Sequence, residues 1–395
     1  MDNRLFLIAK EDIVGYPPVL SIMQALLDLS VEVIFIGTYS DIEQKKTFEK
    51  KGVKFIDVVE YNVKTNQINK IRLQHKFKKE VERILDYNEV TNNDLLWIFQ
   101  STTICLLRNL FDKYRVIAHL FEHTGAQLKW KYRITNPDFS MSSTLQKAYK
   151  VICCEYNRSH IAKGIYQLEE LPVVLPNKYI VEEDSVDTLP EDVAKVIEPI
   201  LKKIDGKKVL IYQGIFMDKE RRLEEFCQAV QFLPDEYVLI AMGRGSQMYE
   251  RIKEQYESDR VIFIPFIRPP FHLQITKRAF IGIMSYFPSK SDIDAVINPI
   301  YCAPNKIFEY ARYSIPMLSN DIPALHYVFK EFNCGRCVSY PITPEGIVES
   351  ISYINKNYKV FSNGASDYYN SVDIKSIISR QILTPVASNC DNSKK

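Results

Sequence analysis

Hydrophobic and polar positions follow two alternating patterns along the chain. Short runs of apolar residues, such as Leu5–Ala9 and Val33–Ile36, have the length and composition of buried strands. Between them, residues 19–30 place apolar side chains at i, i+3, i+4 and i+7, the spacing of one helix face. Strands that alternate with helices in this way predict an α/β fold, in which helices wrap a parallel sheet.

The alternation occurs twice, which predicts two doubly wound, Rossmann-like domains. At 395 residues the chain is longer than one hydrophobic core usually serves. We expect the first domain over residues 1–180, an acidic linker with Pro and Gly over 181–207, and a second domain over 208–365. Residues 366–395 are expected to form a terminal helix that crosses back to the first domain, followed by a polar tail.

Composition and charge exclude several classes of protein. Apolar residues make up 46% and charged residues 25% of the chain, and the net charge of +2 gives no case for a nucleic-acid partner. No stretch approaches the ~20 apolar residues of a membrane span, and the N-terminal apolar run is too short for a secretion signal. The eight cysteines are therefore expected to be reduced thiols in a cytoplasmic protein. Cys334 and Cys337 have the spacing of half a metal site, but no second pair is spaced to complete it, so we expect inert thiols.

Candidate chemistry gathers in the second half. Two Rossmann-like domains facing each other create a ligand cleft where the carboxyl ends of their strands meet. Gly214 and Gly243 each follow a strand there, and helix N-termini behind them favour anions. Their spacing does not fit the dinucleotide-binding pattern GxGxxG. Glu309 stands in an otherwise apolar run, where a carboxylate is uncommon unless it is paired or functional.

Five stretches in order resemble the GT-B fold glycosyltransferases, in particular the family-four (group 1) enzymes, which transfer sugars from nucleotide donors. The stretches are residues 148–179, 209–230, 238–245, 261–286 and 304–321. The last, PNKIFEYARYSIPMLSND, resembles the family's nucleotide-sugar signature and is the most specific.

The resemblance implies roles for the signature residues. The family carries two glutamates eight positions apart, and the second, expected to hold the ribose hydroxyls, matches Glu309. The first would contact the transferred sugar, and its position is occupied here by Tyr301, which leaves the donor sugar and the stereochemistry open. Asn305 and Lys306 would face the diphosphate. Without the family, Glu309 could equally form a surface ion pair with Arg312, worth only ~0.3–0.5 kcal/mol.

The resemblance also implies cations against the diphosphate and no metal site. Lys219 and Arg221 follow the Gly214 loop, with Arg221 the preferred match, and Gly15 resembles the glycine loop that approaches the donor phosphate or the acceptor. Such enzymes commonly use positive side chains and helix dipoles in place of a metal. No cofactor is expected besides the nucleotide-sugar co-substrate. The Asp-Ile-Asp within Ser291–Asp294 lies in a polar loop and is not predicted to bind metal.

In the first domain, His119 and Glu122 are the catalytic candidates, because they leave a strand at the edge expected to face the donor. Glu122 could act as a base or acceptor contact. It could equally satisfy free N–H groups at a helix N-terminus. His119 alternates inward on the strand, where a histidine is more often a hydrogen-bonded core residue.

Two basic and aromatic stretches suit an anionic membrane surface, residues 69–87 and Leu128–Arg133. A solvated helix face is the alternative for the first. We therefore expect a metal-independent, hexosyltransferase-like enzyme, with retention favoured over inversion. It would move sugar from a UDP-sugar to a saccharide or lipid-linked saccharide in capsule or exopolysaccharide synthesis, in the cytoplasm at the inner face of the membrane. A GT-B nucleotide-sugar epimerase and a non-catalytic GT-B partner subunit are the alternatives.

Overall fold

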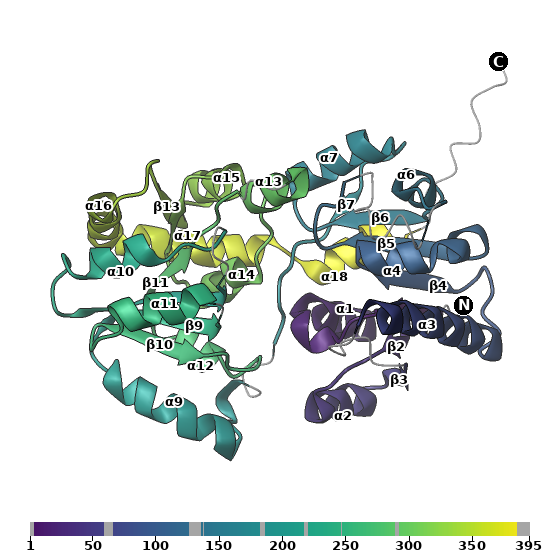
Figure 1. Cartoon of the computed structure of the whole chain (residues 1–395), viewed down its shortest axis with the longest axis horizontal. Coiled ribbons are helices and arrows are strands. Elements are labelled where there is room, and N and C mark those ends of the chain that lie inside the picture. The colour runs from purple at the N-terminus through teal and green to yellow at the C-terminus, as the bar shows by residue number, and fades with distance from the viewer. Residues whose placement is uncertain are drawn as a thin grey trace. The chain divides into compact units, whose positions relative to one another are not determined.

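The computed structural model describes residues 4–58, 66–125, 136, 138–181, 186–216, 220–245, 247–288 and 292–384. The chain forms two compact units (Figure 1). Unit 1 comprises Met1–Pro176 and Asp373–Lys395, and unit 2 comprises Asn177–Val372. The predicted polar tail lies outside the described residues.

Unit 1 is built on a parallel sheet of seven strands in the order β3-β2-β1-β4-β5-β6-β7. The strands are β1 Arg4–Ile8, β2 Glu32–Gly37, β3 Lys54–Asp57, β4 Leu95–Phe99, β5 Arg115–Leu120, β6 Lys150–Cys153 and β7 Val173–Val174. The helices are α1 Pro17–Asp28, α2 Ile42–Lys50, α3 Gln67–Tyr87, α4 Ser101–Leu106, α6 Met141–Leu145, α7 Tyr156–Tyr166 and α18 Ile374–Ile377. The 3-10 helices η1 Ile13–Gly15 and η2 Arg108–Asp112 and the π-helix η3 Ile378–Ile382 are also part of this unit. Strand order reverses between β1 and β4, the place where ligands bind in open α/β sheets.

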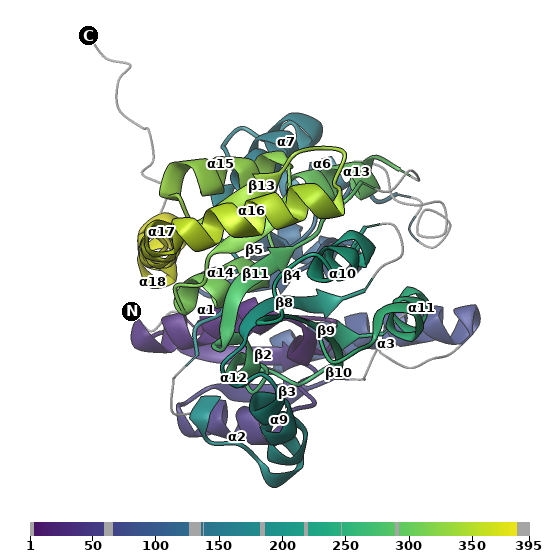
Figure 2. The same ribbon diagram turned by 90° about the vertical axis from the view of Figure 1, so that its left-hand side faces the viewer.

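Unit 2 is built on a second parallel sheet, in the order β10-β9-β8-β11-β12-β13. Its strands are β8 Lys208–Ile215, β9 Tyr237–Arg244, β10 Val261–Pro265, β11 Ala279–Met284, β12 Met317–Asn320 and β13 Gly335–Val338. Its helices are α9 Glu191–Lys203, α10 Glu224–Val230, α11 Gln247–Tyr256, α12 Leu273–Thr276, α13 Ile293–Ile300, α14 Asn305–Arg312, α15 Pro323–Phe332, α16 Pro344–Lys356 and α17 Tyr358–Ser371. Figure 2 faces this unit and shows α10 and α16 together on one face of the sheet. The order reverses between β8 and β11.

Side chains alternate along the strands of unit 2, so that each strand contributes to two separate hydrophobic cores, one on each face of the sheet. Val209 and Ile211 of β8 belong to one apolar cluster, whereas Leu210 and Tyr212 belong to the cluster on the opposite face. Both faces are covered by helices, which explains why these strands are continuous apolar runs in the sequence. The parallel α/β architecture predicted from periodicity is confirmed.

The acidic stretch at residues 181–207 contains a helix. In α9, Val193 and Ile197 are buried in the same cluster as Val209 of β8. The helix therefore packs on unit 2, in a segment that the sequence predicted to be an acidic linker. Its charged residues face solvent, and Pro199 interrupts the sequence of the helix, which conceals the helical spacing.

The chain passes between the units twice, after Pro176 and after Val372. Close to both crossings, Lys178 Nζ donates hydrogen bonds to the carbonyl oxygens of Tyr369 and Val372 at 2.6 and 2.8 Å. Beyond Val372, α18 packs beside α1, and Tyr149 Oη donates to the Thr384 carbonyl at 3.2 Å. The end of the described chain thus forms part of unit 1.

Among the described helices, none combines the length and apolar character needed to cross a bilayer.

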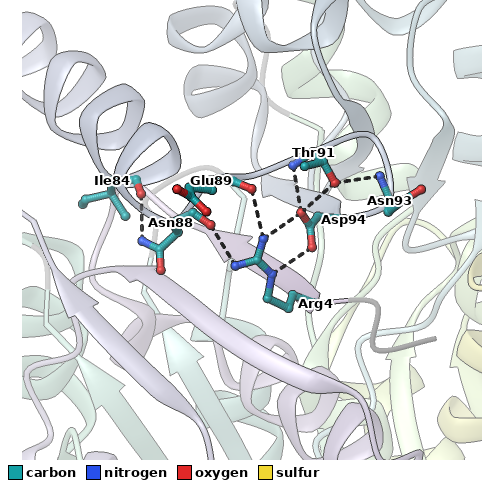
Figure 3. Close-up of polar contacts among 7 residues, drawn as sticks. All are labelled: Arg4, Ile84, Asn88, Glu89, Thr91, Asn93 and Asp94. Atoms are coloured by element: carbon teal, nitrogen blue, oxygen red, sulfur yellow. Dashed lines mark hydrogen bonds and ion pairs between the residues drawn. The ribbon is translucent and has the colours of Figure 1, made fainter.

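A bidentate ion pair closes the amino end of the unit 1 sheet (Figure 3). Arg4 donates from Nε and Nη2 to the two carboxylate oxygens of Asp94 at 3.0 and 2.9 Å, and from Nη1 to the Asn88 carbonyl at 2.8 Å. Asp94 also accepts from the Thr91 N–H at 2.8 Å. Burial alone would raise the pKa of Asp94, but the hydrogen bonds from Arg4 and Thr91 outweigh it and hold the pKa below its ordinary value.

Replacing Asp94 by Asn should lower the free energy of unfolding by about 1–3 kcal/mol at pH 7, because the Arg4 guanidinium loses its charged acceptor. The contribution of Asp94 is complete above the ordinary aspartate pKa and is lost as the pH falls from there through the lowered pKa of the folded state. Urea unfolding of both proteins at pH 7 and pH 3 measures this. Asp112→Asn, which removes an exposed ion pair with Lys147, should stay within about 0.5 kcal/mol. An equal effect of the two substitutions would contradict the assignment.

Candidate functional site

Glu309 is buried within unit 2 and held by two polar side chains. It lies in the middle of α14 and is 9% exposed. Its Oε2 accepts a short hydrogen bond from Gln213 Nε2 at the end of β8, and its Oε1 lies 3.4 Å from His272 Nε2. Arg312, the alternative partner, donates instead to the Val181 carbonyl at 2.7 Å. Glu309 is therefore a buried, positioned carboxylate.

Further contacts fix this arrangement. Thr276 Oγ1 donates to Gln213 Oε1 at 2.7 Å, which turns the amide N–H₂ group of Gln213 toward Glu309. Tyr310, the neighbour of Glu309, donates its hydroxyl to the Ile211 carbonyl at 3.1 Å and so fixes α14 against β8. His272 Nδ1 is buried and has no hydrogen-bond partner among the residues that the structure describes.

Lys306 lies one turn before Glu309 and is 8% exposed. Its Nζ is 4.0 Å from the centre of the Tyr212 ring and 5.2 Å from that of Tyr286. Burial lowers the pKa of Lys306 to about 7, and the positive charge of Arg221 contributes to the decrease. The amine is thus removed from water, and a neighbouring anion would favour its protonated, charged form.

Arg221 also lies beside the Tyr286 ring. Its guanidinium carbon is 4.2 Å from the ring centre, a cation–π distance, and Nη1 donates to the Glu220 carbonyl at 3.0 Å. The Tyr286 backbone is fixed by Asn320, whose side chain accepts from the Tyr286 N–H at 2.9 Å and donates to its carbonyl at 2.5 Å. Lys306 and Arg221 therefore both lie near the Tyr286 ring. The other predicted cation, Lys219, lies outside the described residues.

The two predicted glycines are paired across β8 and β9. Gly214 has φ of +137°, a conformation that side chains disfavour, and a Cβ there would point at Lys306 Nζ, 3.7 Å away. A Cβ on Gly243 would lie 1.7 Å from the Gly214 carbonyl oxygen. Gly214 thus leaves the space next to Lys306 Nζ open. Gly243 has no side chain and therefore allows the Gly214 carbonyl of the adjacent strand to approach closely.

The start of α14 offers further donors. Pro304 is the N-cap and supplies no capping side chain, and Asn305 is the half-buried first residue. Free N–H groups and the positive end of the helix dipole at such a position attract anions. Tyr301 is half-buried at the end of α13, where its N–H donates to the Ile297 carbonyl at 2.9 Å. In the Asp-Ile-Asp segment, Asp292 caps α13 through the Ala295 N–H at 2.9 Å.

The two catalytic candidates of unit 1 have different environments. His119 is 1% exposed, its Nδ1 accepts from Trp97 Nε1 at 3.3 Å, and its Nε2 lies 3.5 Å from Cys154 Sγ. Burial lowers the pKa of His119 to about 3, so the ring is neutral at physiological pH. This is the environment of a core histidine. Glu122 is exposed just beyond β5, and Gly15 is exposed at the end of η1.

Polar groups that the sequence did not single out gather at the strand reversal of unit 1. Lys10 is 2% exposed, and its Nζ lies 3.6 Å from Glu11 Oε1. Tyr16 Oη donates to Glu11 Oε2 at 2.6 Å, and its ring stacks on Phe121 at 5.7 Å. Gln100, directly after β4, has φ of +71°, a conformation uncommon outside functional sites and turns. In the sequence, the feature that could have indicated this cluster is Lys10, a lysine close after a buried strand.

Comparison with solved structures places this architecture among known folds. No family model matches the sequence, and no curated protein matches it. A glycosyltransferase from Rickettsia africae is similar with a TM-score of 0.64 at 12% identity, covering 96% of each chain. HepE from Anabaena in complex with UDP-glucose has a TM-score of 0.61 at 12% identity, covering 95% of this chain and 96% of that one. MnaA from S. aureus, solved with UDP, has a TM-score of 0.60 at 12% identity, covering 95% and 94%. The chain has the GT-B fold, as the sequence resemblance implied.

The lowered pKa of Lys306 should be visible in the pH dependence of stability. Between about pH 7 and pH 10 the unfolded chain keeps a proton on this lysine that the folded chain has released, so stability rises with pH in this window. Lys306→Met should remove that rise. Denaturant unfolding of both proteins at pH 7, 8.5 and 10 provides the comparison, with exposed Lys330→Met as control. Parallel curves for wild type and Lys306→Met would contradict the burial of an ionisable amine.

Proposed function

We propose that the protein is a glycosyltransferase that binds a UDP-sugar at the Glu309 site and transfers the sugar to a hydroxyl group. The acceptor would be a saccharide or a lipid-linked saccharide. The observation that carries the proposal is the buried Glu309 carboxylate, held by Gln213 and His272, one helical turn from the desolvated cation Lys306. The GT-B fold and the UDP and UDP-glucose complexes of proteins with this fold support the choice of donor.

Glu309 would bind the ribose of the nucleotide. A carboxylate has about four acceptor positions, of which Gln213 occupies one and His272 faces another. The remaining positions suit two adjacent hydroxyl donors, which is the arrangement on a ribose. Since the side chain is already fixed, binding would cost little conformational entropy.

The cations would bind the diphosphate. Lys306, Arg221 and the free N–H groups at the start of α14 provide positive potential within one region of unit 2. Such groups stabilise the negative charge that develops on a departing nucleotide without needing a metal ion. Asn305 would add a polar contact. Arrival of the diphosphate would raise the pKa of Lys306 and fix it in the charged form.

Transfer would proceed with retention of configuration, in line with the resemblance to the family-four enzymes. Tyr301 stands where those enzymes have their first signature glutamate, so its hydroxyl would contact the sugar in place of a carboxylate. Glu122, exposed at the end of β5, is the proposed acceptor contact in unit 1. His119, neutral and in the core, would have a structural role.

Removing the Glu309 carboxylate should weaken UDP binding by about 10–100-fold, because hydrogen bonds to a charged acceptor contribute about 1.5–3 kcal/mol. Calorimetric titration of wild type, Glu309→Ala and the control Glu331→Ala, an exposed glutamate on α15, tests this. UDP binding unchanged in Glu309→Ala would refute the ribose assignment. Wild-type binding of UDP-glucose without transfer or hydrolysis would favour a binding subunit over an enzyme.

The membrane is the proposed location of the acceptor. On α3, Lys76, Lys79 and Arg83 line an open hollow together with His75 and Glu80. Ile68 and Tyr87 near the two ends of the helix are 73% and 86% exposed. Positive charge beside exposed apolar groups suits an anionic bilayer, and therefore surface polysaccharide assembly at the inner face of the membrane. The second basic stretch, Leu128–Arg133, lies outside the described residues.

Reversing three charges on α3, Lys76→Glu with Lys79→Glu and Arg83→Glu, should abolish sedimentation with phosphatidylglycerol vesicles, because each basic residue near such a surface contributes about 1 kcal/mol. UDP binding should be unaffected. Reversing three exposed charges on α9, Lys195→Glu with Lys202→Glu and Lys203→Glu, is the matched control and should leave sedimentation unchanged. Wild-type protein that sediments equally with phosphatidylcholine vesicles, or with neither, would argue against the electrostatic contact.

A further inference from the structure

A second cluster of reactive side chains lies at the far edge of the unit 2 sheet. Asp321 directly follows β12, His326 lies on α15, and Cys337 lies on β13. Each residue offers one ligand atom, and these atoms all lie within 4.8 Å of one another. The three residues come from three consecutive elements, so the fold itself brings them together.

The local structure does not use these side chains as helix caps. Ile322 is the N-cap of α15 and no side chain caps that helix, although Asp321 is its immediate neighbour. The Asp321 carboxylate instead lies 2.9 Å from His326 Nδ1. The two side chains are 45% and 47% exposed, so an ion could reach them from solvent.

Cys337 differs from its neighbour in the CxxC segment. Cys337 is half-buried, and its Sγ lies 3.7 Å from Ser319 Oγ of β12. Cys334 is fully buried, and its thiol donates to the Val328 carbonyl at 3.8 Å. Only Cys337 therefore belongs to the cluster. The serine hydroxyl is a suitable partner for a metal-bound thiolate, because such neighbours orient metal ligands.

One sulfur, one nitrogen and one oxygen ligand make up a characteristic donor set. Magnesium and calcium prefer oxygen ligands alone, whereas zinc accepts cysteine, histidine and carboxylate together. Zinc–ligand distances of about 2.0–2.3 Å place the ligand atoms about 3.5 Å from one another, so the longer of the present separations, up to 4.8 Å, would have to shorten. Rotation of the exposed His326 and Asp321 side chains could supply this small movement.

We propose that Asp321, His326 and Cys337 form a zinc site in which water completes the tetrahedron. The ion would connect the end of β12, helix α15 and strand β13. The preceding residue, Asn320, holds the Tyr286 backbone, so the site adjoins the support of Arg221 and Lys306 without including it. Binding would displace the Cys337 proton, since the thiolate is the form that coordinates zinc.

The test is a calorimetric titration of the untagged full chain with Zn²⁺, after removal of metal with a chelator. We expect one zinc ion per chain, and no binding when Mg²⁺ is titrated instead. His326→Ala and Cys337→Ser should each weaken zinc binding at least 10-fold. The matched controls Cys334→Ser and His160→Ala should bind as wild type. Saturating zinc should also raise the melting temperature of wild type by about 5 °C, and should not do so in Cys337→Ser.

Cobalt substitution identifies the sulfur ligand. Co²⁺ added to the stripped protein should produce a thiolate charge-transfer band, which is lost in Cys337→Ser and kept in Cys334→Ser. Circular dichroism of each variant without metal confirms that it is folded. Failure of the wild-type chain to bind zinc overturns the proposal. So does a band that survives in Cys337→Ser, because a different cysteine would then hold the metal. UDP binding by the same preparations is a separate readout and does not decide the outcome.

Discussion

The candidate site depends on one requirement, that a carboxylate removed from water must keep its hydrogen bonds. Glu309 meets it through Gln213, whose amide is oriented in turn by Thr276. The three residues belong to α14, β8 and α12, so this short chain of polar contacts joins three elements at the strand reversal of unit 2. Partly satisfied buried polar networks are costly, and those that persist fix a single arrangement. The position of α14, and hence of its first-turn donors, follows from this network.

The cations nearby are supported in a different way. Lys306 and Arg221 rest on the faces of Tyr212 and Tyr286, and among the described residues Lys306 forms no ion pair. Aromatic faces stabilise a cation without neutralising it, so its field remains available to an incoming anion. A carboxylate in their place would have satisfied the charge within the protein. The site therefore combines one fixed anion with two cations, of which Lys306 has no ion pair among the described residues and Arg221 has a long one, 4.0 Å from Nη1 to Glu220 Oε2. This suits a ligand that is polar at one end and negatively charged at the other.

Periodicity and turn residues were enough to predict the two parallel sheets, because strands buried on both faces are continuous apolar runs. Residues 181–207 were harder, since the apolar side of α9 consists of a few residues such as Val193 and Ile197 among many charges. For the site, the sequence pointed to Glu309 and Lys306 through a local motif. Gln213 and Thr276 could not be found in that way, because they are 96 and 33 residues away from Glu309, and only the fold brings Gln213 to Glu309 and Thr276 to Gln213. The inward position of His119 on its strand favoured a core histidine, but its partners Trp97 and Cys154 come from distant elements and could not be predicted.

The contact of Lys178 with the Tyr369 and Val372 carbonyls has a mechanical consequence. Here one ammonium group holds the outgoing and the returning segment against each other inside unit 2. The two segments are therefore joined at one point within unit 2, by a charged side chain that is only 8% exposed. Their mutual position inside unit 2 thus depends on one side chain rather than on the length of either segment.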